Sequence, residues 1–297
     1  MIIVTGASGF LGQAICAALR AGGEDVRTIG RGAGSDIAWP ASGDFDANAV
    51  ARIAEASAVI HLAGATIGMR WTAPQRRAIL DSRVRLTAVL ASALAKASSR
   101  PATWLSASAV GYYGDTGDTW VDETSGPGGG FLADTAFAWE GATRAAADAG
   151  VRVVPLRLGV VMGRGGMLAK LRLPFLFGAG GRLGSGRQWL SWIAIEDAVG
   201  IVRRCLGDAT ITGAVNVVSP NPVTNAQFTA AFARALHRPA IVPVPAFALR
   251  AVYGEMAEQV LLAGQRVRPA RLLALNYPFA LADLGGAIAA AGNGAPA

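Results

Sequence analysis

The 297-residue chain has few of the residues that staple small domains or bind metals: it contains only two cysteines and two histidines. Cys16 and Cys205 lie far apart, so the sequence excludes a disulfide-rich scaffold and suits a reducing compartment. No cysteine or carboxylate stands at metal-ligand spacing from His61 or His237, and we therefore expect no metal site. A chain of this length can bury enough apolar surface to fold without either device.

Charged residues are also scarce, at 16% of the chain, and Lys96 and Lys170 are the only lysines among 27 basic residues. The net charge is +7, yet no basic run exceeds two residues, which argues against a nucleic-acid-binding surface. No apolar run approaches the roughly 18 residues of a membrane span. The uncharged first 19 residues lack a basic start and are interrupted by glycine, unlike a signal peptide. We therefore expect a cytoplasmic protein with no nucleic-acid or membrane partner.

Short apolar runs alternate with helical periodicities along the first 220 residues. Strands are predicted over 2–4, 26–29, 58–62, 103–106, 152–157 and 215–218, and helices over 11–19, 47–55, 74–98 and 132–148. This alternation is typical of a parallel sheet with helices on both faces. The predicted fold class is α/β, a Rossmann-type doubly wound parallel sheet with a smaller, mainly helical C-terminal domain.

Two changes of composition divide the chain. Residues 164–187 hold seven glycines, which predict a mobile binding loop rather than packed structure. From about residue 221 the helical stretches are short and punctuated by proline. We predict a dinucleotide-binding domain over 1–163, rejoined by about 188–220, and a small substrate-binding domain over 221–297.

A glycine-rich turn, Thr5-Gly6-Ala7-Ser8-Gly9-Phe10-Leu11-Gly12, joins the first strand to the first helix. In a dinucleotide-binding turn the three glycines serve a tight bend, the close approach of a pyrophosphate, and helix-to-strand packing. Free N–H groups at the helix N-terminus then bind the anion. We predict cofactor contacts at Thr5, Gly6, Ser8, Gly9, Phe10, Leu11 and Gly12.

This turn resembles that of the extended branch of the short-chain dehydrogenase/reductase superfamily. His61-Leu62-Ala63-Gly64 is similar to the family's segment beside the cofactor ribose, and the stretch from Ser106 to Gly114 is similar to its serine-bearing active-site strand. The remaining matches are to a subfamily of epimerase/dehydratase-like proteins with a small C-terminal extension, at Trp189-Leu190-Ser191-Trp192-Ile193, Glu196-Asp197, Pro243-Val244-Pro245 and Gly264-Gln265-Arg266-Val267. The resemblance implies a nicotinamide cofactor with contacts at Leu62, Ala63 and Gly64, and we also expect cofactor contacts at Arg83 and Ser106.

The residue after the second strand bears on the choice between NAD and NADP. An NAD enzyme places an Asp or Glu about 20 residues past the glycine turn to bind the ribose 2′-hydroxyl. Here Arg31 follows the strand, and the next acid is Asp36. Arginine can clamp a 2′-phosphate, so we expect NADP(H) to be preferred over NAD(H), with an exposed, ligand-free arginine as the alternative. Asp44 and Asp46 precede the third strand and are candidates to contact the adenine, but a helix cap explains one of them equally well.

The catalytic pair of the wider family, a tyrosine and a lysine four residues apart on one helix, is missing. No tyrosine in this chain is followed by lysine at that spacing. Alignment of the helix through Trp139 and Glu140 places Leu132 and Ala136 at the two positions. The first step of epimerisation needs a base, and a tyrosine with an ordinary pKa near 10 is a poor base at pH 7.

Reduction of a carbonyl needs only a proton donor, and a neutral phenol is one. We therefore expect Tyr112 or Tyr113 to donate a proton, with Ser108 or Ser106 polarising the carbonyl. Core packing beside the sheet is the alternative for both tyrosines. The sequence also offers Asp134 and Glu140 as reserve acids, although we expect both to be exposed carboxylates on a helix.

The predicted function is an NADP(H)-binding oxidoreductase, a monomer or homodimer, that reduces a carbonyl of a small or sugar-like substrate. One alternative is a nucleotide-sugar epimerase or dehydratase with an atypical active site. Another is a non-catalytic protein that uses NADP(H) occupancy as a regulatory state. Arginines at six positions are candidates for a pocket that holds a phosphorylated or carboxylated ligand: Arg70, Arg83, Arg164, Arg182, Arg187 and Arg266.

Overall fold

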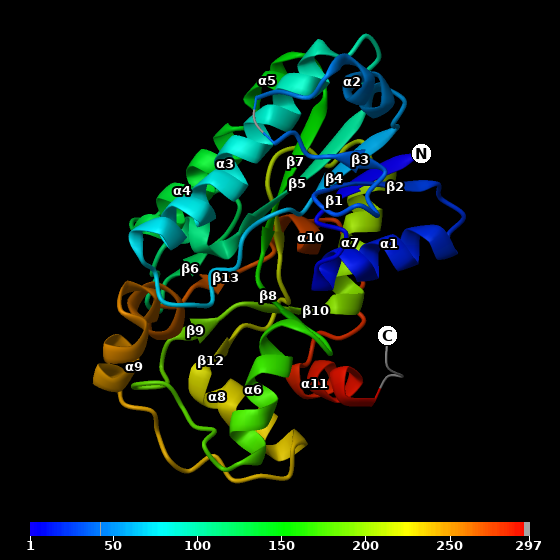
Figure 1. Cartoon of the computed structure of the whole chain (residues 1–297). Coiled ribbons are helices and arrows are strands. Elements are labelled where there is room, and N and C mark those ends of the chain that lie inside the picture. The colour runs from blue at the N-terminus through cyan, green and yellow to red at the C-terminus, as the bar shows by residue number, and fades with distance from the viewer. Residues whose placement is uncertain (42, 294–297) are drawn as a thin grey trace.

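Seven parallel strands form one sheet at the centre of the upper lobe in the computed structural model, which describes residues 1–41 and 43–293 (Figure 1). The strand order is β11-β7-β5-β4-β1-β2-β3. The strands are β1 (Ile2–Thr5), β2 (Val26–Gly30), β3 (Ile37–Ala38), β4 (Ala58–His61), β5 (Thr103–Ala109), β7 (Arg152–Leu158) and β11 (Val215–Val217). The chain runs outward from β1 in both directions, which confirms the predicted doubly wound α/β fold.

Helices cover both faces of the sheet, as the alternating strands and helices predict. One face carries α1 (Phe10–Ala21), α7 (Ile195–Gly207) and α10 (Ala270–Ala274), packed on Val4 and its neighbours. The other face carries α2 (Ala47–Ala54), α3 (Ala73–Lys96), α4 (Phe131–Gly141) and α5 (Arg144–Asp148). Both faces of the central strands β1, β4 and β5 are therefore buried, and strands this apolar are stable only in that setting.

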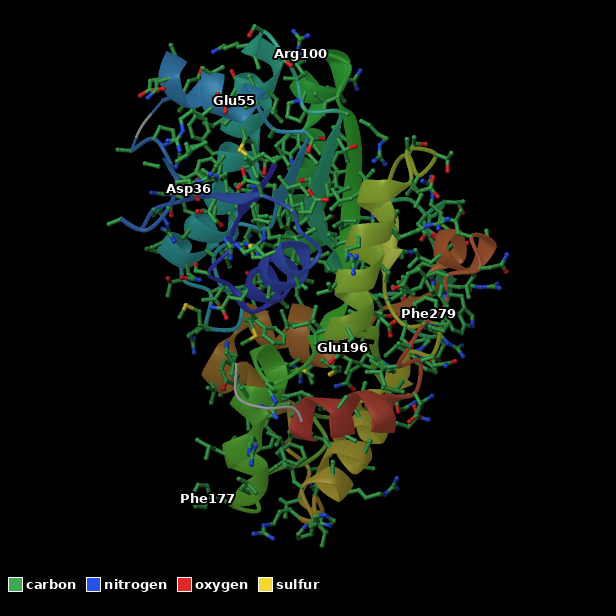
Figure 2. The ribbon with its side chains drawn as sticks, turned by 90° about the vertical axis from the view of Figure 1, so that its right-hand side faces the viewer. Asp36, Glu55, Arg100, Phe177, Glu196 and Phe279 are labelled. Atoms are coloured by element: carbon green, nitrogen blue, oxygen red, sulfur yellow. The ribbon has the colours of Figure 1, made fainter. Side chains whose placement is uncertain are left out.

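A second lobe lies below the sheet (Figure 1). It consists of α6 (Gly166–Leu176), α8 (Asn225–Ala235) and α11 (Leu284–Asn293) with the short strands β8 (Val160–Met162), β9 (Trp189–Leu190), β10 (Trp192–Ala194) and β12 (Val223–Thr224). Its core includes Trp192, Phe228 and Phe232. Figure 2 shows Phe177 at the far end of this lobe and Glu196, in the first turn of α7, where the two lobes meet.

The glycine-rich segment 164–187 differs from the predicted loop, because α6 occupies its first half. Several of its glycines are there for close packing. A side chain at Gly165 would collide with the Phe10 ring, one at Gly180 with Phe175, and one at Gly181 with the Val242 carbonyl. The inference that so many glycines cannot serve packing was therefore wrong: these positions are glycine because other groups fill the space.

The C-terminal residues pack against both lobes. Between α8 and α11 lie α9 (Ala246–Tyr253), a π-helical turn η2 (Ala257–Leu262), β13 (Arg266–Val267) and α10. β13 pairs with β6 (Trp120–Val121), and Leu272 of α10 enters the core beneath the main sheet. The predicted helix over 132–148 is interrupted between α4 and α5, and α7 and α11 were not predicted. Among the described residues, the helices are too short or too polar to cross a bilayer.

Candidate cofactor cleft and active site

The glycine turn between β1 and α1 lies directly against the end of β4. Gly6 has a φ of +69°, and a Cβ atom there would lie 2.7 Å from the Leu62 carbonyl carbon and 2.9 Å from the Ala63 nitrogen. A Cβ atom on Gly12 would overlap the Gly6 carbonyl oxygen, so α1 can approach the turn only with glycine at this position. The fold therefore brings three predicted cofactor contacts together, Gly6, Leu62 and Ala63. The N-terminus of α1 lies beside them.

Thr5 supports this contact from inside the sheet. Its fully buried hydroxyl accepts hydrogen bonds from the Leu62 and Ala63 N–H groups at 3.2 and 3.3 Å and lies 2.6 Å from Nδ1 of His61. With both lone pairs engaged, the Thr5 hydroxyl donates to Nδ1, and Nε2 of His61 then carries the ring proton toward Thr87 at 2.9 Å. Burial lowers the pKa of His61 to about 3, so this histidine is a neutral strand residue of the core.

Ser8, Gly9, Phe10 and Leu11 fill the rest of the turn. Gly9 caps the N-terminus of α1, and its N–H donates to the Gly6 carbonyl at 3.0 Å. Leu11 packs on the core beneath the sheet, whereas Ser8 is exposed. Phe10 points toward the second lobe, where its ring lies among Gly163, Gly165 and Gly166 at the start of α6. The turn therefore also fixes where α6 begins.

Arg31 directly follows β2 and is exposed. No carboxylate in the described part of the chain lies within ion-pair distance of it. Asp36 is engaged elsewhere: it accepts hydrogen bonds from the backbone N–H and the hydroxyl of Thr28, at 2.8 and 2.9 Å. Asp46 caps α2 by accepting from the Ala49 N–H, and Asp44 pairs with Lys96. The end of β2 thus presents one arginine and no free acid.

Arg83, on α3, reaches the segment that follows β4. Its guanidinium lies 3.3 Å from where a Cβ atom of Gly64 would stand, and Nη1 donates to the Ala65 carbonyl at 3.0 Å. The guanidinium also lies over the ring of Trp139 on α4, with Cζ 5.1 Å from the ring centroid. Burial without a compensating carboxylate lowers the pKa of Arg83 to about 10.

A buried polar network occupies the carboxyl ends of β5, β7 and β11, where Ser108, Arg157 and Asn216 lie side by side on neighbouring strands. Arg157 forms a two-pronged ion pair with Glu140 of α4, at 2.8 and 2.9 Å. The Ser108 hydroxyl donates to the same carboxylate at 2.6 Å. The side chain of Glu140 is only 15% exposed, so its predicted place on an exposed helix face is wrong, whereas Asp134 is exposed as predicted. The helix periodicity does not show that Arg157 faces Glu140 from another element.

The two tyrosines follow β5 in a 3₁₀ turn, η1 (Val110–Tyr113). The Tyr113 hydroxyl donates to Oδ1 of Asn216 at 2.7 Å and accepts from Nη1 of Arg157 at 2.9 Å. Burial raises the pKa of Tyr113 despite the neighbouring guanidinium. The Tyr112 ring stacks on the same guanidinium, with Cζ of Arg157 3.5 Å from its centroid. Its hydroxyl forms no hydrogen bond within residues 1–41 and 43–293, and it is not among the fully buried polar atoms.

The face of α4 that would carry the family's tyrosine and lysine is apolar. Ala136 packs with both η1 tyrosines, and Gly111 of η1 lies 3.6 Å from the Leu132 Cβ when given a Cβ of its own. The phenols of this site therefore come from the turn after β5 and not from α4. Ser106 is 1% exposed, and its hydroxyl has no hydrogen-bond partner among the described residues.

Most of the candidate arginines serve other contacts. Arg70 donates to the carbonyls of Ala251 and Val252, and Arg266 lies between the rings of Trp120 and Trp189. Arg164 and Arg182 donate to backbone carbonyls, and Arg187 is exposed. The fold does not gather these arginines into one pocket. The sequence analysis missed Arg157 and Asn216, whose only signal is a polar residue at the end of an apolar strand.

Comparisons with known proteins agree with this architecture. The model of the NAD dependent epimerase/dehydratase family matches residues 2–218, and that of a domain of unknown function, DUF1731, matches residues 244–291. Epimerase family protein Mb2239 of Mycobacterium bovis is 44% identical over 285 residues, which are 94% of this chain and 93% of that protein.

Two solved structures are similar over nearly the whole chain. The human epimerase family protein SDR39U1, crystallised with NADPH, is 35% identical with a TM-score of 0.89, and the alignment covers 98% of this chain and 99% of that one. The nucleoside-diphosphate sugar epimerase from Corynebacterium glutamicum is 37% identical with a TM-score of 0.80, over 97% of this chain and 57% of that one.

Proposed function

Because the chain belongs to the NAD-dependent epimerase/dehydratase family and has the extended short-chain dehydrogenase/reductase fold, we propose that it is an NADP(H)-dependent oxidoreductase that reduces a carbonyl. The observation that carries the proposal is the pairing of a dinucleotide-type turn with a site that retains an unpaired phenol and, among the described residues, has no lysine to turn that phenol into a base. Carbonyl reduction needs a hydride donor and a proton donor, and this pairing supplies a place for each.

The residues around the glycine turn fit a dinucleotide. Gly6 and Gly12 let β4 and α1 approach the turn closely, where a side chain would collide with the backbone, and the α1 N-terminus directs free N–H groups to the same place. Arg31 follows β2 and is exposed, and Asp36 is held in its own hydrogen bonds, which supports a 2′-phosphate partner for Arg31. The similar human protein was crystallised with NADPH, which supports the same preference here. When bound, NADPH supplies the hydride.

We assign the proton donor to Tyr112. Its hydroxyl is unpaired among the described residues and keeps some exposure, whereas the Tyr113 proton is committed to Asn216 and the Ser108 proton to Glu140. Tyr112 is also held firmly, because its ring stacks on Arg157 and meets the Tyr113 ring edge to face at 5.3 Å between centroids. A fixed phenol in the turn after β5, the strand that pairs with β4, can protonate the oxygen that hydride transfer leaves behind.

The same network argues against oxidation-dependent epimerisation at neutral pH. Arg157 is the cation that contacts both phenols, and Glu140 already neutralises it. Burial keeps the pKa of Tyr113 above its ordinary value, and Ala136 supplies no lysine ammonium. A phenolate base for the first step of epimerisation is therefore lacking among the described residues of this site.

The test measures NADPH consumption over a panel of aldehydes, ketones and 4-keto sugar nucleotides, beside epimerisation of sugar nucleotides at pH 7 and pH 9.5. We expect reduction of at least one carbonyl class, and Tyr112→Phe should lower kcat about 100-fold. Tyr253→Phe, on α9, is the matched control and should leave kcat unchanged. Efficient epimerisation at pH 7 would contradict the proposal.

A non-catalytic NADP(H)-binding protein is the second candidate. It is favoured by one observation: the Ser108 and Tyr113 hydroxyls, which an active enzyme would turn toward a carbonyl, donate into the protein. Tight NADPH binding with no turnover of any carbonyl in the panel would select this candidate.

A further inference from the structure

The positive charge of this protein is concentrated in the segments that build most of the second lobe. Residues 160–195 and 209–254 contain no aspartate or glutamate, and together they carry eight arginine or lysine residues, all of them exposed. In the rest of the chain the 20 acidic residues slightly outnumber the basic ones, although the net charge of the whole chain is +7. Among the described residues, only Arg250 of these eight pairs with a carboxylate, that of Glu258. The second lobe therefore presents uncompensated positive charge to solvent.

The same two segments hold the most exposed apolar side chains. Large apolar side chains that are at least 62% exposed occur at five described positions: Leu173, Phe177, Ile241, Val242 and Phe247. In the described part of the chain, no other large apolar side chain is more than 59% exposed. Single exposed apolar residues are ordinary, but several that gather among unpaired cations are typical of an interaction surface.

Four of these side chains lie at the end of the second lobe that points away from the sheet. Leu173 and Phe177 are four residues apart at the end of α6, so they lie on one side of that helix. The loop that carries Ile241 and Val242 connects α8 to α9 and passes below α6 in Figure 1. Figure 2 shows Phe177 at the same end of the molecule.

Two contacts join this loop to the end of α6. A Cβ atom on Gly181 would overlap the carbonyl oxygen of Val242, so the two backbones touch. Arg238, just after α8, donates from Nε to the Leu176 carbonyl at 3.3 Å. We call the surface that results the distal face and define it by six exposed residues: Arg172, Leu173, Phe177, Arg238, Ile241 and Val242.

The loop holds its apolar side chains outward on a restrained backbone. Three prolines between residues 239 and 245 fix their own φ angles. The Val244 N–H donates to the Arg182 carbonyl at 2.8 Å, which ties the loop to the segment after α6. A restrained loop loses little conformational freedom when it binds a partner, so the exposed Ile241 and Val242 are prepared for contact.

We propose that the distal face binds an anionic phospholipid surface. Lipid phosphates pair with the guanidinium groups of Arg172 and Arg238, and the boundary between headgroups and acyl chains accepts the exposed apolar side chains. A nucleic acid would supply the phosphates but no apolar medium for side chains such as Ile241. A second copy of the chain would bring like charges together.

This contact is peripheral, because no helix among the described residues could cross a bilayer. The expectation of no membrane partner rests on the lack of a spanning run, and contact with a lipid surface needs no such run. The distal face contains none of the residues that we assign to the cofactor or to proton donation. The proposal therefore stands or falls separately from the proposed function.

Cosedimentation of the full chain with lipid vesicles tests the proposal. We expect vesicles of phosphatidylglycerol and phosphatidylcholine in equal amounts to bind about tenfold more tightly than phosphatidylcholine alone, and salt to weaken the binding. Phe177→Ser combined with Ile241→Ser should lower the affinity for anionic vesicles about tenfold. Arg172→Gln combined with Arg238→Gln should have a similar effect.

The matched control positions are exposed residues of the upper lobe. Phe137, on α4, is 58% exposed, and Figure 2 shows Arg100 at the opposite end of the molecule from Phe177. Phe137→Ser and Arg100→Gln should change the affinity for anionic vesicles less than twofold. Urea midpoints and NADPH affinity should stay at the wild-type values in every variant, because each replaced side chain is exposed and lies outside the glycine turn.

A fluorescent label shows whether the distal face itself enters the lipid surface. The two native cysteines, Cys16 and Cys205, are buried, so a thiol-reactive, polarity-sensitive dye can be attached selectively to a Val242→Cys variant. We expect its emission to shift to shorter wavelength on anionic vesicles. The same dye on a Phe137→Cys variant should show no shift.

Three results would overturn the proposal. The first is equal affinity for anionic and neutral vesicles. The second is an unshifted emission at Val242→Cys, or an equal loss of binding in the distal-face and control variants, which would mean that vesicles bind the basic protein without a defined face. The third is loss of binding in the arginine variant alone together with tighter binding to a DNA duplex than to vesicles, which would assign the distal face to a nucleic acid.

Discussion

Arg157 and Arg83 are both drawn into the interior of the upper lobe, and their surroundings differ in one respect. Arg157 meets the carboxylate of Glu140 through two hydrogen bonds, and the hydroxyls of Ser108 and Tyr113 complete the group. Arg83 meets only backbone carbonyls and the face of Trp139. A buried arginine whose three guanidinium nitrogens all donate hydrogen bonds is part of the framework, whereas one that lacks an anion is prepared for a ligand.

The pKa values of the two guanidinium groups follow this difference. Burial disfavours the charge of both. For Arg157 the hydrogen bonds and negative charge of Glu140 outweigh burial and raise the pKa above its ordinary value. For Arg83 burial acts alone and lowers the pKa to about 10. The same residue type is therefore stabilising where a carboxylate meets it and costly where none does.

The largest expected effect comes from breaking the paired site. Arg157→Met leaves Glu140 buried without its cation, and we expect a loss of about 3 to 5 kcal/mol of unfolding free energy. Urea denaturation, monitored by tryptophan fluorescence, measures this loss of unfolding free energy. The double variant Arg157→Met with Glu140→Leu should recover most of the loss, because no charge is then left unpaired. If single and double variants were equally unstable, the ion pair would not be what holds β5, β7 and α4 together.

His61 extends the comparison to a buried base with only neutral partners. Its pKa of about 3 in the folded protein lies below the ordinary 6.5, so the unfolded chain binds more protons between these values. Stability is therefore complete above pH 6.5 and is lost as the pH falls toward 3, by about 3 kcal/mol at pH 4. Urea midpoints measured from pH 7 to pH 4 should show this slope, and His61→Gln should flatten it. An equally steep slope in the variant would assign acid sensitivity to other groups.

The comparison extends to Arg31, an exposed arginine that has no carboxylate partner among the described residues. We expect NADPH to bind at least tenfold more tightly than NADH, a difference of about 1.4 kcal/mol, because Arg31 has no acid to compete with a phosphate. Arg31→Asp should narrow or reverse the preference, whereas Arg27→Asp, on β2 and already paired with Asp25 and Asp36, serves as control. Titration of tryptophan fluorescence with NADPH and with NADH measures the two affinities of each variant. Equal affinities of the wild type for both cofactors would contradict the NADP preference.

The smallest effect on stability is expected at Arg83, and it sharpens the contrast most. Arg83→Met removes a charge that no carboxylate balances, so we expect the unfolding free energy to change by less than about 1 kcal/mol. The affinity for NADPH should nevertheless fall, because we expect Arg83 to contact the cofactor. A loss of stability as large as that of Arg157→Met would show that Arg83 belongs to the framework and would erase the distinction between the two sites.

Much of the cofactor half could be predicted from the sequence because its contacts are local. Strand, glycine turn and helix follow one another over residues 2–21, so the roles of Gly6 and Gly12 can be inferred from spacing and from the geometry of the peptide chain. The lack of a tyrosine-lysine pair could also be established by inspection. His61 could be placed in the core for the same reason, since it stands inside a short apolar strand.

The polar network around Arg157 was decided by tertiary structure. Glu140 and Arg157 belong to different elements, and only the register of β5 and β7 and the packing of α4 on β5 bring Ser108, Glu140 and Arg157 together. Arg238 reaches the end of α6 only because α6 forms within a glycine-rich segment whose sequence predicts a loop. Sequence by itself determined the elements and the turn, because those depend on neighbours along the chain. The fold decided which charges are paired and which are left for a ligand. Ion pairing depends on the distance between residues that lie far apart along the chain, and the sequence does not give that distance.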